Sequence, residues 1–237
     1  YDTDGTTLLA SGVINSVDSN YVNLTGYCAG FQTITDRTGK TISVNGDAKL
    51  TTSQKKFGSA SLILDGVGDY LQISNNNDFD FTDYTLEAWI YFPSLPTNVY
   101  SMVFAASGQN SYWGVRRIGS TLYITSYDGT TINEQASGTG IQVGQWAHIA
   151  WSRSGTTLKT FLNGTQVHSG TSSATYNLSG ITIGYSTSYS GQYYFAGNID
   201  DVRVTKDLAR YTSSFTTPTA QLTGDLDTVL LLHFNGT

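Results

Sequence analysis

Short runs in which apolar and polar residues alternate recur along this chain from about residue 31 onward. This period is typical of β-strands with one buried face, and helical periodicity is nearly absent. Asp128-Gly129 and Asn163-Gly164 lie between such runs and predict tight hairpins, whose corner residues need a positive φ. We therefore expect an all-β fold built as a two-sheet antiparallel sandwich. The predicted strands are 61–64, 70–73, 85–92, 101–105, 113–117, 121–125, 147–154, 157–162, 181–185 and 198–205.

The chain contains no long linker, and its 237 residues suffice for one large β-sandwich. We divide it into an N-terminal arm at 1–30, a sandwich domain at 31–217 and a C-terminal tail at 218–237. Four large aromatic residues on predicted strands are expected to fill the gap of roughly 10 Å between the two sheets. These residues are Trp89, Trp146, Trp151 and Phe161.

Composition and charge argue against several kinds of partner. Charged residues make up only 13% of the chain, and the 12 basic residues are scattered in a chain of net charge −6. Nucleic-acid binding needs a concentrated basic face, so we expect no nucleic-acid partner. No apolar run approaches the ~18 residues of a membrane span, so we expect no membrane insertion. The single cysteine, Cys28, permits neither an internal disulfide nor a cysteine-based zinc site.

A charge-poor surface rich in Gly, Ser, Thr, Asn and Tyr is typical of extracellular β proteins. We therefore expect an extracellular, cell-surface or virion-surface location. Four segments also carry a family resemblance through their order and spacing. They are FGSASLILDG with GDYLQI at 57–73, FDF with YTLEAWI at 79–90, GQWAHIA with LKTFLNG at 144–164, and FAGNIDDVRV at 195–204.

Together these segments resemble the laminin-G-like (LamG) branch of the concanavalin A-like lectin/glucanase superfamily. Similar repeats occur in bacterial surface proteins and in phage tail or appendage proteins. The resemblance implies a jelly-roll sandwich, in agreement with the alternation of the strands.

Catalysis is not expected, although the superfamily includes glucanases. Those enzymes need two carboxylates about 5–10 Å apart, which on a strand means acidic residues at i and i+2 or i+4. The chain has two glutamates, Glu87 and Glu134, and neither has an acidic neighbour at that spacing. The three histidines are isolated, and no nucleophile elbow or phosphate-binding glycine loop occurs. We therefore predict that the protein is not an enzyme.

A structural Ca²⁺ is the cofactor that the resemblance implies, held in part by the aspartate at the position of Asp200. Calcium prefers several oxygen ligands, and Asp65 and Asp69 in a turn-rich stretch are candidates for further ligands. The alternative is that Asp200 caps a bend and binds no ion.

Aromatic residues in polar loops are the indication of sugar binding, because flat rings stack on the apolar faces of pyranoses. Ordinary cross-strand packing or subunit contact is the alternative. The candidate glycan-binding residues are Tyr112, Trp113, Tyr189, Tyr193 and Tyr194. Candidate glycosylation sites are Asn23, Asn163, Asn177 and Asn235.

The C-terminal tail reads DTVLLLHFNGT at 227–237, and in LamG-like repeats such a run opens the domain. The stretch that usually follows it lies near the other end of this chain, as FQTITDRTG at 31–39. Three placements are open for strand 228–234: its own sandwich, a following repeat, or the sandwich of a neighbouring subunit. An apolar strand left in water would invite association, so it must be buried somewhere. Its apolar residues are Val229, Leu230, Leu231, Leu232 and Phe234.

These features predict a non-catalytic subunit of an extracellular filament or virion appendage. In that hypothesis the C-terminal strand complements a neighbouring subunit and builds a head-to-tail homopolymer. The alternative hypothesis is a lectin-like receptor-binding or adhesion module whose partners are glycans.

Overall fold

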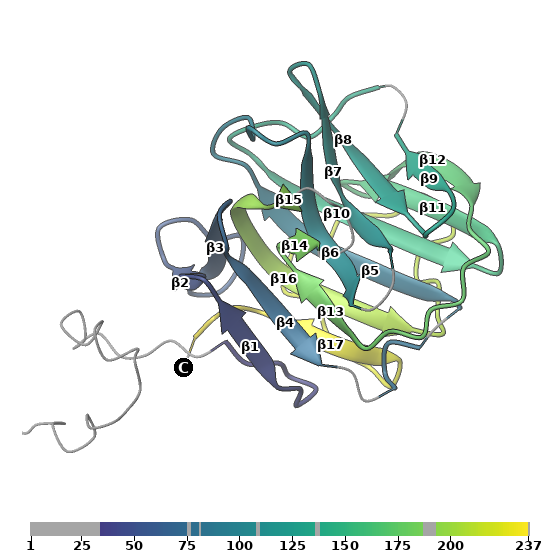
Figure 1. The fold of residues 1–237 in the computed structure, drawn as a ribbon, viewed down its shortest axis with the longest axis horizontal. Helices are drawn as coiled ribbons and strands as arrows, with labels where there is room; N and C mark the ends of the chain where they lie inside the picture. Colours follow the sequence, from purple (N-terminus) through teal and green to yellow (C-terminus); the bar gives the residue numbers. More distant parts are fainter. Residues whose placement is uncertain are drawn as a thin grey trace, which may run out of the picture. The chain divides into compact units, whose positions relative to one another are not determined.

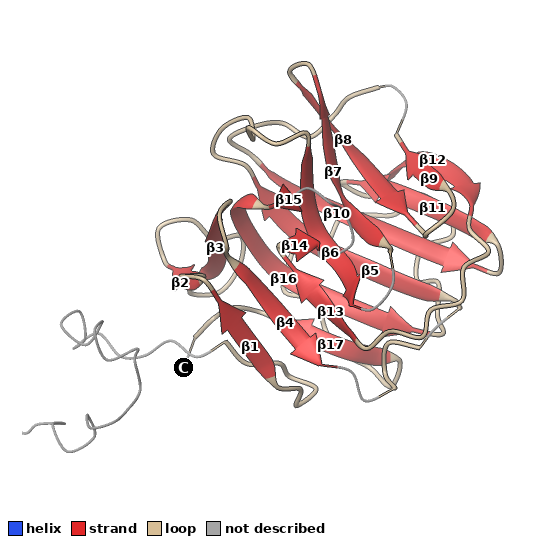
Figure 2. Cartoon of the chain, in the orientation of Figure 1, coloured by secondary structure: helices blue, strands red, loops and turns tan. Residues whose placement is uncertain are grey.

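Two antiparallel sheets carry the fold, and the sandwich predicted from the alternation of residues is confirmed (Figure 1). The computed structural model describes residues 34–74, 77–80, 82–107, 110–135, 138–186 and 193–236. Of these, Ile34–Gly236 form one compact unit, which includes the C-terminal tail. The N-terminal arm at 1–30 lies outside the described residues. Figure 2 shows strands and loops in the described part, where no helix is long and apolar enough to span a membrane.

The first sheet, which we call the seven-stranded sheet, pairs strands that are distant in the sequence. Its register is set by contacts such as Ile181↔Ile73 and Thr182↔Ala105. In spatial order it consists of β1 (Ile42–Asn45), β4 (Tyr70–Ser74), β13 (Gly180–Ile183), β6 (Tyr100–Ser107), β7 (Tyr112–Ile118), β8 (Thr121–Tyr127) and β9 (Ile132–Glu134).

The second sheet, the eight-stranded sheet, lies opposite. In spatial order it consists of β12 (Thr165–Thr171), β11 (Thr157–Leu162), β10 (Trp146–Ser154), β5 (Tyr84–Tyr91), β16 (Ala196–Lys206), β3 (Ser61–Asp65) and β2 (Lys49–Thr51), with β17 (Thr228–Leu232) paired to β16. A short hairpin of β14 (Tyr185–Ser186) and β15 (Tyr193–Tyr194) lies against β6 of the seven-stranded sheet.

The main core lies between the two sheets and takes alternate residues from each strand. Trp151 belongs to it, as predicted. The same expectation for Trp89, Trp146 and Phe161 is wrong, because these residues lie on the outer side of the eight-stranded sheet. Residues along these strands point alternately to the core and to the outer side. The outer side is itself largely buried, so large aromatic residues occur there beside polar residues such as Glu87 and His148.

The chain itself covers the outer side of the eight-stranded sheet with residues 207–226, which we call the covering segment. The Arg210 amide donates to Thr85 Oγ1 at 2.8 Å, and the Phe215 amide donates to the Gly164 carbonyl at 2.8 Å. The ring of Phe215 stacks on Tyr211 with centroids 3.6 Å apart, and both contact Phe161. Backbone and ring contacts thus fix this irregular segment to the sheet.

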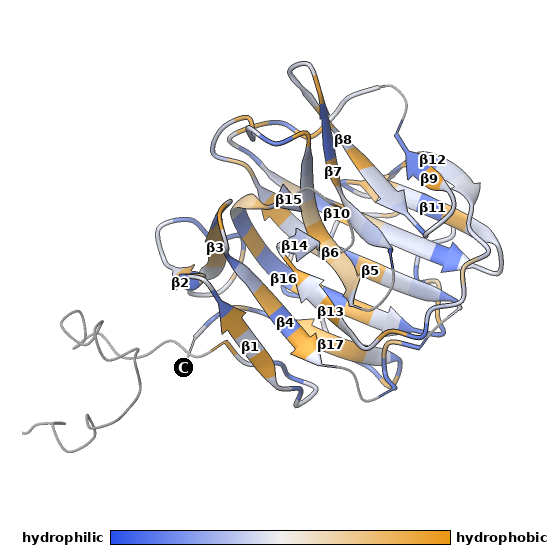
Figure 3. Ribbon diagram, in the orientation of Figure 1, coloured by the Kyte–Doolittle hydropathy of each residue, from blue (hydrophilic) through white to orange (hydrophobic). Residues whose placement is uncertain are grey.

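The C-terminal strand β17 lies in the sandwich of its own chain, paired antiparallel with β16 from Val202↔Leu232 to Thr205↔Thr228. Leu230, Leu232 and Phe234 belong to the main core, and Leu231 is also buried. Figure 3 shows the hydrophobic character of this strand.

The second edge of β17 is also occupied. The Arg37 amide donates to the Leu231 carbonyl, and the Leu231 amide donates to Asp36 Oδ1 at 2.8 Å. The segment that usually follows such a strand in LamG-like repeats therefore lies beside it, as a circular permutation requires. Both edges and the apolar side chains of Val229–Phe234 are thus used within one chain, and their role as an assembly strand for a neighbour stays a prediction.

Candidate functional site

The outer face of the seven-stranded sheet differs from the covered face opposite. On β7, Trp113 and Val115 point into the core, so Tyr112, Gly114 and Arg116 point outward by alternation. The same rule places Tyr123, Thr125 and Tyr127 of β8 outward, because Leu122 and Ile124 are core residues. We call this surface the tyrosine face.

Four tyrosines, which we call the central tyrosines, meet over β6, β7 and β8. Tyr100 contacts Tyr193 with ring centroids 5.3 Å apart and Tyr112 at 5.9 Å, and Tyr112 contacts Tyr127 at 5.8 Å. They pack around Met102 and Ala105 in a second small apolar cluster. Tyr112 is buried, whereas the other three are partly exposed. The β14–β15 hairpin contributes Tyr193 and so helps to build this cluster.

A second group, the edge tyrosines, lies toward β4. Tyr185 stacks face to face on Tyr194 with centroids 4.4 Å apart, and Tyr70 contacts Tyr185 at 5.1 Å. All three are partly exposed. Desolvation, together with the neighbouring hydroxyl of Tyr185, raises the pKa of Tyr194 above its ordinary value. Tyr194 therefore presents a neutral phenol at physiological pH.

An ion pair accompanies the central tyrosines. Arg116 Nη1 donates to Glu134 Oε1 at 2.8 Å and to Oε2 at 3.1 Å, and the guanidinium lies 5.7 Å from the Tyr100 ring. The hydrogen bond to Glu134 raises the pKa of Arg116 above its usual range. The ion pair thus holds two opposite charges in fixed positions and adds no net charge to the tyrosine face.

Of the five predicted glycan-binding residues, Tyr112 and Tyr193 lie among the central tyrosines and Tyr194 among the edge tyrosines, although Tyr112 is only 1% exposed and packs beneath its neighbours. Trp113 is a correction: it is 0% exposed, and its Nε1 donates to Tyr84 Oη at 3.1 Å within the core. Tyr189 lies outside the described residues.

Sequence reasoning missed Tyr70, Tyr100 and Tyr127 on the same face. They join the others through strand pairing, which the sequence does not display. The signal that was available is the alternation on β7, since adjacent residues such as Tyr112 and Trp113 point to opposite sides of a strand.

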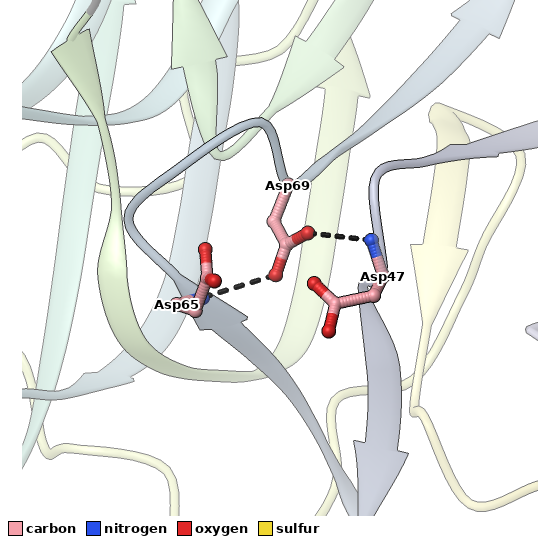
Figure 4. Close-up of side chains that lie close together, drawn as sticks. All are labelled: Asp47, Asp65 and Asp69. Atoms are coloured by element: carbon pink, nitrogen blue, oxygen red, sulfur yellow. Dashed lines mark hydrogen bonds between the residues drawn. The ribbon is translucent and has the colours of Figure 1, made fainter.

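An acidic cluster lies where the turn after β1 meets the turn between β3 and β4 (Figure 4). Asp47, Asp65 and Asp69 each offer a carboxylate oxygen within 4.8 Å of the others. Asp69 accepts hydrogen bonds from the Asp47 amide at 2.7 Å and the Asp65 amide at 3.1 Å. Desolvation raises the pKa of Asp69, and the charge of Asp65 adds to the effect.

The turn before the cluster depends on a glycine. Gly46 has a φ of 69°, and a Cβ at that position would collide with Asp69 Oδ1 and with the Gly68 carbonyl. Close approach of the two turns is therefore possible only without a side chain at residue 46. A pocket of about 410 Å³ adjoins the cluster, with Lys49, Pro93 and Leu95 among its walls.

The donor set of the cluster fits a hard divalent cation, which prefers carboxylate and carbonyl oxygens. Two backbone amides hold Asp69 in position and leave lone pairs on both of its oxygens. Asp47, Asp65 and Asp69 are thus the described residues that could hold a metal. Asp47 was missed in the sequence because only the β1–β4 register, with Asn45 opposite Tyr70, brings its turn to the other two.

Asp200 does not join this cluster, which corrects its grouping with Asp65 and Asp69. It is 0% exposed within β16, and its Oδ2 accepts from the Lys56 amide at 2.8 Å and the Phe57 amide at 3.1 Å. Burial raises the pKa of Asp200 to about 6. The arrangement matches the alternative in which Asp200 caps a bend.

Glu87 is the other acidic residue that a catalytic reading would consider, and it is 0% exposed beneath the covering segment. It accepts from Arg203 Nη2 at 2.6 Å, from Tyr211 Oη at 2.8 Å and from His148 Nε2 at 3.1 Å. Burial alone would raise the pKa of Glu87, but the hydrogen bond and charge of His148, with the charge of Arg203, hold it below the usual value. The carboxylate is an internal counter-ion.

The candidate glycosylation sites have distinct surroundings. Asn163 is a hairpin corner with a φ of 48°, and its Oδ1 accepts from the His148 amide at 2.9 Å. Asn235 is half-buried and accepts from the Ser59 amide. Asn177 is exposed. Asn23 lies outside the described residues.

Comparison with known families decides the relationship that the sequence resemblance suggests. The model described as the concanavalin A-like lectin/glucanases superfamily, of the laminin G kind, matches residues 65–209. The chain belongs to this superfamily. The match includes strands of both large sheets from β4 to β16, whereas β1, β2, nearly all of β3 and β17 lie outside it. No curated protein matches the sequence.

Three solved structures have a similar fold. Domain 4 of AbnA, an extracellular arabinanase of Geobacillus stearothermophilus in complex with arabinotriose, is 19% identical over 70% of this chain and 81% of that chain, with a TM-score of 0.54. A putative carbohydrate-binding protein of Bacteroides ovatus is 12% identical over 94% and 78%, with a TM-score of 0.54. The enzymatically active domain of bacteriophage CBA120 tailspike protein 2 is 14% identical over 87% and 34%, with a TM-score of 0.60. At these identities the likeness concerns the fold.

Proposed function

We propose that the protein is a non-catalytic, lectin-like carbohydrate-binding module that uses the tyrosine face. The observation that carries the proposal is the group of central tyrosines, which combines partly exposed rings with the Arg116–Glu134 pair on one sheet surface. Such rings stack on the C–H faces of sugars, and fixed polar groups beside them orient the hydroxyls. The architecture is also that of an arabinanase domain solved with arabinotriose, so the sandwich suits saccharide binding.

A non-catalytic role is supported by the position of the two glutamates. Glu87 is sealed beneath the covering segment, and Glu134 is held by Arg116. A glycosidase needs two carboxylates on either side of the scissile bond. Among the outward positions of the described strands on the tyrosine face, Glu134 is the single carboxylate. An extracellular or surface location fits such a module.

Assembly into a filament through the C-terminal strand has less support. That hypothesis requires β17 to leave its own sheet, although its side chains fill the core and both of its edges are hydrogen-bonded. Strand addition in trans would vacate these positions in the donor. Glycan binding therefore remains the function that the geometry favours.

Alanine substitution of two central tyrosines tests the proposal. We expect Tyr100→Ala and Tyr127→Ala each to weaken binding to a glycan identified on an array by about tenfold, because a ring contact contributes roughly 1–1.5 kcal/mol. Titration calorimetry measures the change. Tyr91→Ala is the matched control, since Tyr91 is a half-buried tyrosine on the eight-stranded sheet that contacts Trp146. Equal losses in all three variants, or no binding to any glycan, would contradict the proposal.

For the acidic cluster we propose Ca²⁺ as the bound ion, acting as a clamp between the two turns. An ion that binds the folded state alone stabilises it, by about 2.7 kcal/mol at a hundred times Kd. We expect millimolar Ca²⁺ to raise the melting temperature of the wild type and a chelator to reverse the increase. Asp47→Asn should abolish the response. Asp227→Asn, at an exposed position in the turn before β17, should retain it. A response that survives Asp47→Asn would place the ion elsewhere.

A further inference from the structure

Charge on the tyrosine face is confined to one pair. Within the described strands of the seven-stranded sheet, the outward positions carry uncharged residues apart from Arg116 and Glu134: tyrosines, neutral polar or small residues, and the apolar Met102, Ile118 and Ile132. Gln72 and Thr182 are typical: the first donates to Ser107 Oγ at 3.0 Å, and the second donates to the Tyr185 carbonyl at 2.6 Å.

The one guanidinium on this face is already committed. Both Glu134 oxygens accept from Arg116 Nη1, and Tyr100 covers the same group. A ligand carboxylate or sulfate that bound this guanidinium would lie close to the negative charge of Glu134. Like charges so close cost several kcal/mol. The net charge of −6 opposes anionic ligands as well.

The tyrosines form a row rather than a single socket. Ring contacts run from Tyr70 through Tyr185 to Tyr194, and from Tyr193 through Tyr100 and Tyr112 to Tyr127. β15 connects the two groups through its backbone, because it carries Tyr193 and Tyr194 in succession, with their rings on opposite sides of the strand. Tyr70 on β4 and Tyr127 on β8 are four strand steps apart, which at about 4.8 Å per step is roughly 19 Å. This span exceeds one pyranose ring and suits several consecutive sugars.

From these observations we propose that the tyrosine face binds an extended, uncharged polysaccharide chain, internally rather than at a terminal sugar. The inference rests on the proposed function and specifies its ligand class. Stacking along the row supplies the affinity, while the Arg116–Glu134 pair orients hydroxyls as a neutral donor and acceptor. Binding should therefore depend little on ionic strength, unlike recognition of an anionic glycan by a free cation.

Polysaccharides with one backbone and two charge states test the ligand class. The probes are hydroxyethyl cellulose against carboxymethyl cellulose, and methyl-esterified against de-esterified homogalacturonan, with arabinan and xylan as further neutral chains. We expect affinity electrophoresis to show that neutral chains retard the protein and that each charged counterpart retards it at least about tenfold more weakly. The retardation by neutral chains should change by less than about twofold between low and high salt. Stronger binding to the charged members, or binding that high salt abolishes, overturns the inference and leaves the proposed function intact. No retention by any polysaccharide or array glycan overturns both.

An oligosaccharide series from the neutral chain that binds tests the extended geometry. We expect affinity to rise with each added sugar from the disaccharide to the hexasaccharide. Affinity that is complete with one or two sugars would refute the extended site. Tyr70→Ala and Tyr127→Ala, at opposite ends of the row, should each weaken the hexasaccharide by about tenfold, with Tyr91→Ala as the control. An effect from one end alone would also refute it, and the wild-type series decides the question if a variant misfolds.

Discussion

The two outer faces of this sandwich differ in how far the rest of the chain covers them. On the eight-stranded sheet, the covering segment seals Glu87, His148 and Arg203 away from solvent. On the seven-stranded sheet, a single short hairpin lies over β6 and leaves rings partly exposed beside Arg116 and Glu134. Both faces carry an arginine–glutamate pair, yet one pair is buried structure and the other borders a surface that a ligand can reach.

The comparison shows that the chain covers one outer face with its own residues and leaves the other partly exposed, and the proposed function assigns recognition to the exposed face. Residues 207–226 supply the hydrogen bonds and rings that a partner would otherwise bring to the eight-stranded sheet. The tyrosine face has no such covering among the described residues beyond the β14–β15 hairpin. An exposed aromatic surface in a soluble domain marks a place of interaction. Strands with the same alternation of residues thus form a buried outer face in one sheet and a partly exposed outer face in the other, depending on which segment covers them.

The largest expected effect comes from breaking the covered ion pair. Arg203→Met should lower the free energy of unfolding by about 3–5 kcal/mol, because Glu87 would remain buried without the arginine that donates to it at 2.6 Å. Urea denaturation measures the loss. Arg116→Met on the tyrosine face is the matched control and should cost less than about 1 kcal/mol, since that pair is partly exposed. Similar losses of unfolding free energy in the two variants would contradict the conclusion that only the covered ion pair contributes strongly to stability.

Sequence patterns predict the sandwich because one side of nearly every strand faces the core. They predict the sides less well where both are buried. All but the last residue of β5 are buried, so hydrophobicity alone does not separate Leu86, which faces the core, from Trp89, which faces the outer side. The covering segment itself has no alternation and is held by particular contacts, so its position could not be foreseen.

The candidate sites depend on register even more strongly. Tyr112 and Tyr193 meet through the order β13-β6-β7 and a hairpin, and Asp47 meets Asp69 through the pairing of β1 with β4. Each residue type was a fair candidate, but the grouping is a property of long-range pairing. The opposite holds for β17, whose apolar run was recognised as a strand that must be buried, with its place left open.

The next effect concerns the core strand that completes the covered sheet. Leu232→Ala should lower the free energy of unfolding by about 2–5 kcal/mol, because a 0% exposed leucine leaves a cavity between the sheets. The particle mass measured by light scattering should not change. Leu226→Ala, at an exposed position two residues before β17, should have almost no effect on stability. Loss of a polymer in the Leu232 variant, without loss of monomer stability, would instead favour assembly through this strand.

The smallest effect is a pH dependence that belongs to the covered face. Asp201 is buried, accepts from the Leu222 amide at 2.7 Å, and has a backbone φ of 50° at a bulge in β16. Desolvation, reinforced by the charges of Asp200 and Glu87 and opposed by Arg203, raises the pKa of Asp201 to about 7. His233, with its Nε2 3.6 Å from Asp201 Oδ1, faces the same carboxyl group.

Because the folded state holds a proton that the unfolded chain releases near pH 3.9, this group stabilises the fold most at low pH. The contribution is lost as pH rises through about 7. Asp201→Asn keeps an acceptor for Leu222 and should reduce the fall in unfolding free energy between about pH 5 and 8 by roughly 2–3 kcal/mol. A smaller slope from Asp200 should remain, since burial raises its pKa to about 6. Chemical denaturation across that range measures both slopes, with Glu134→Gln on the tyrosine face as the comparison. An equal reduction of the pH dependence of the unfolding free energy in the Glu134→Gln variant would contradict the assignment of this dependence to Asp201.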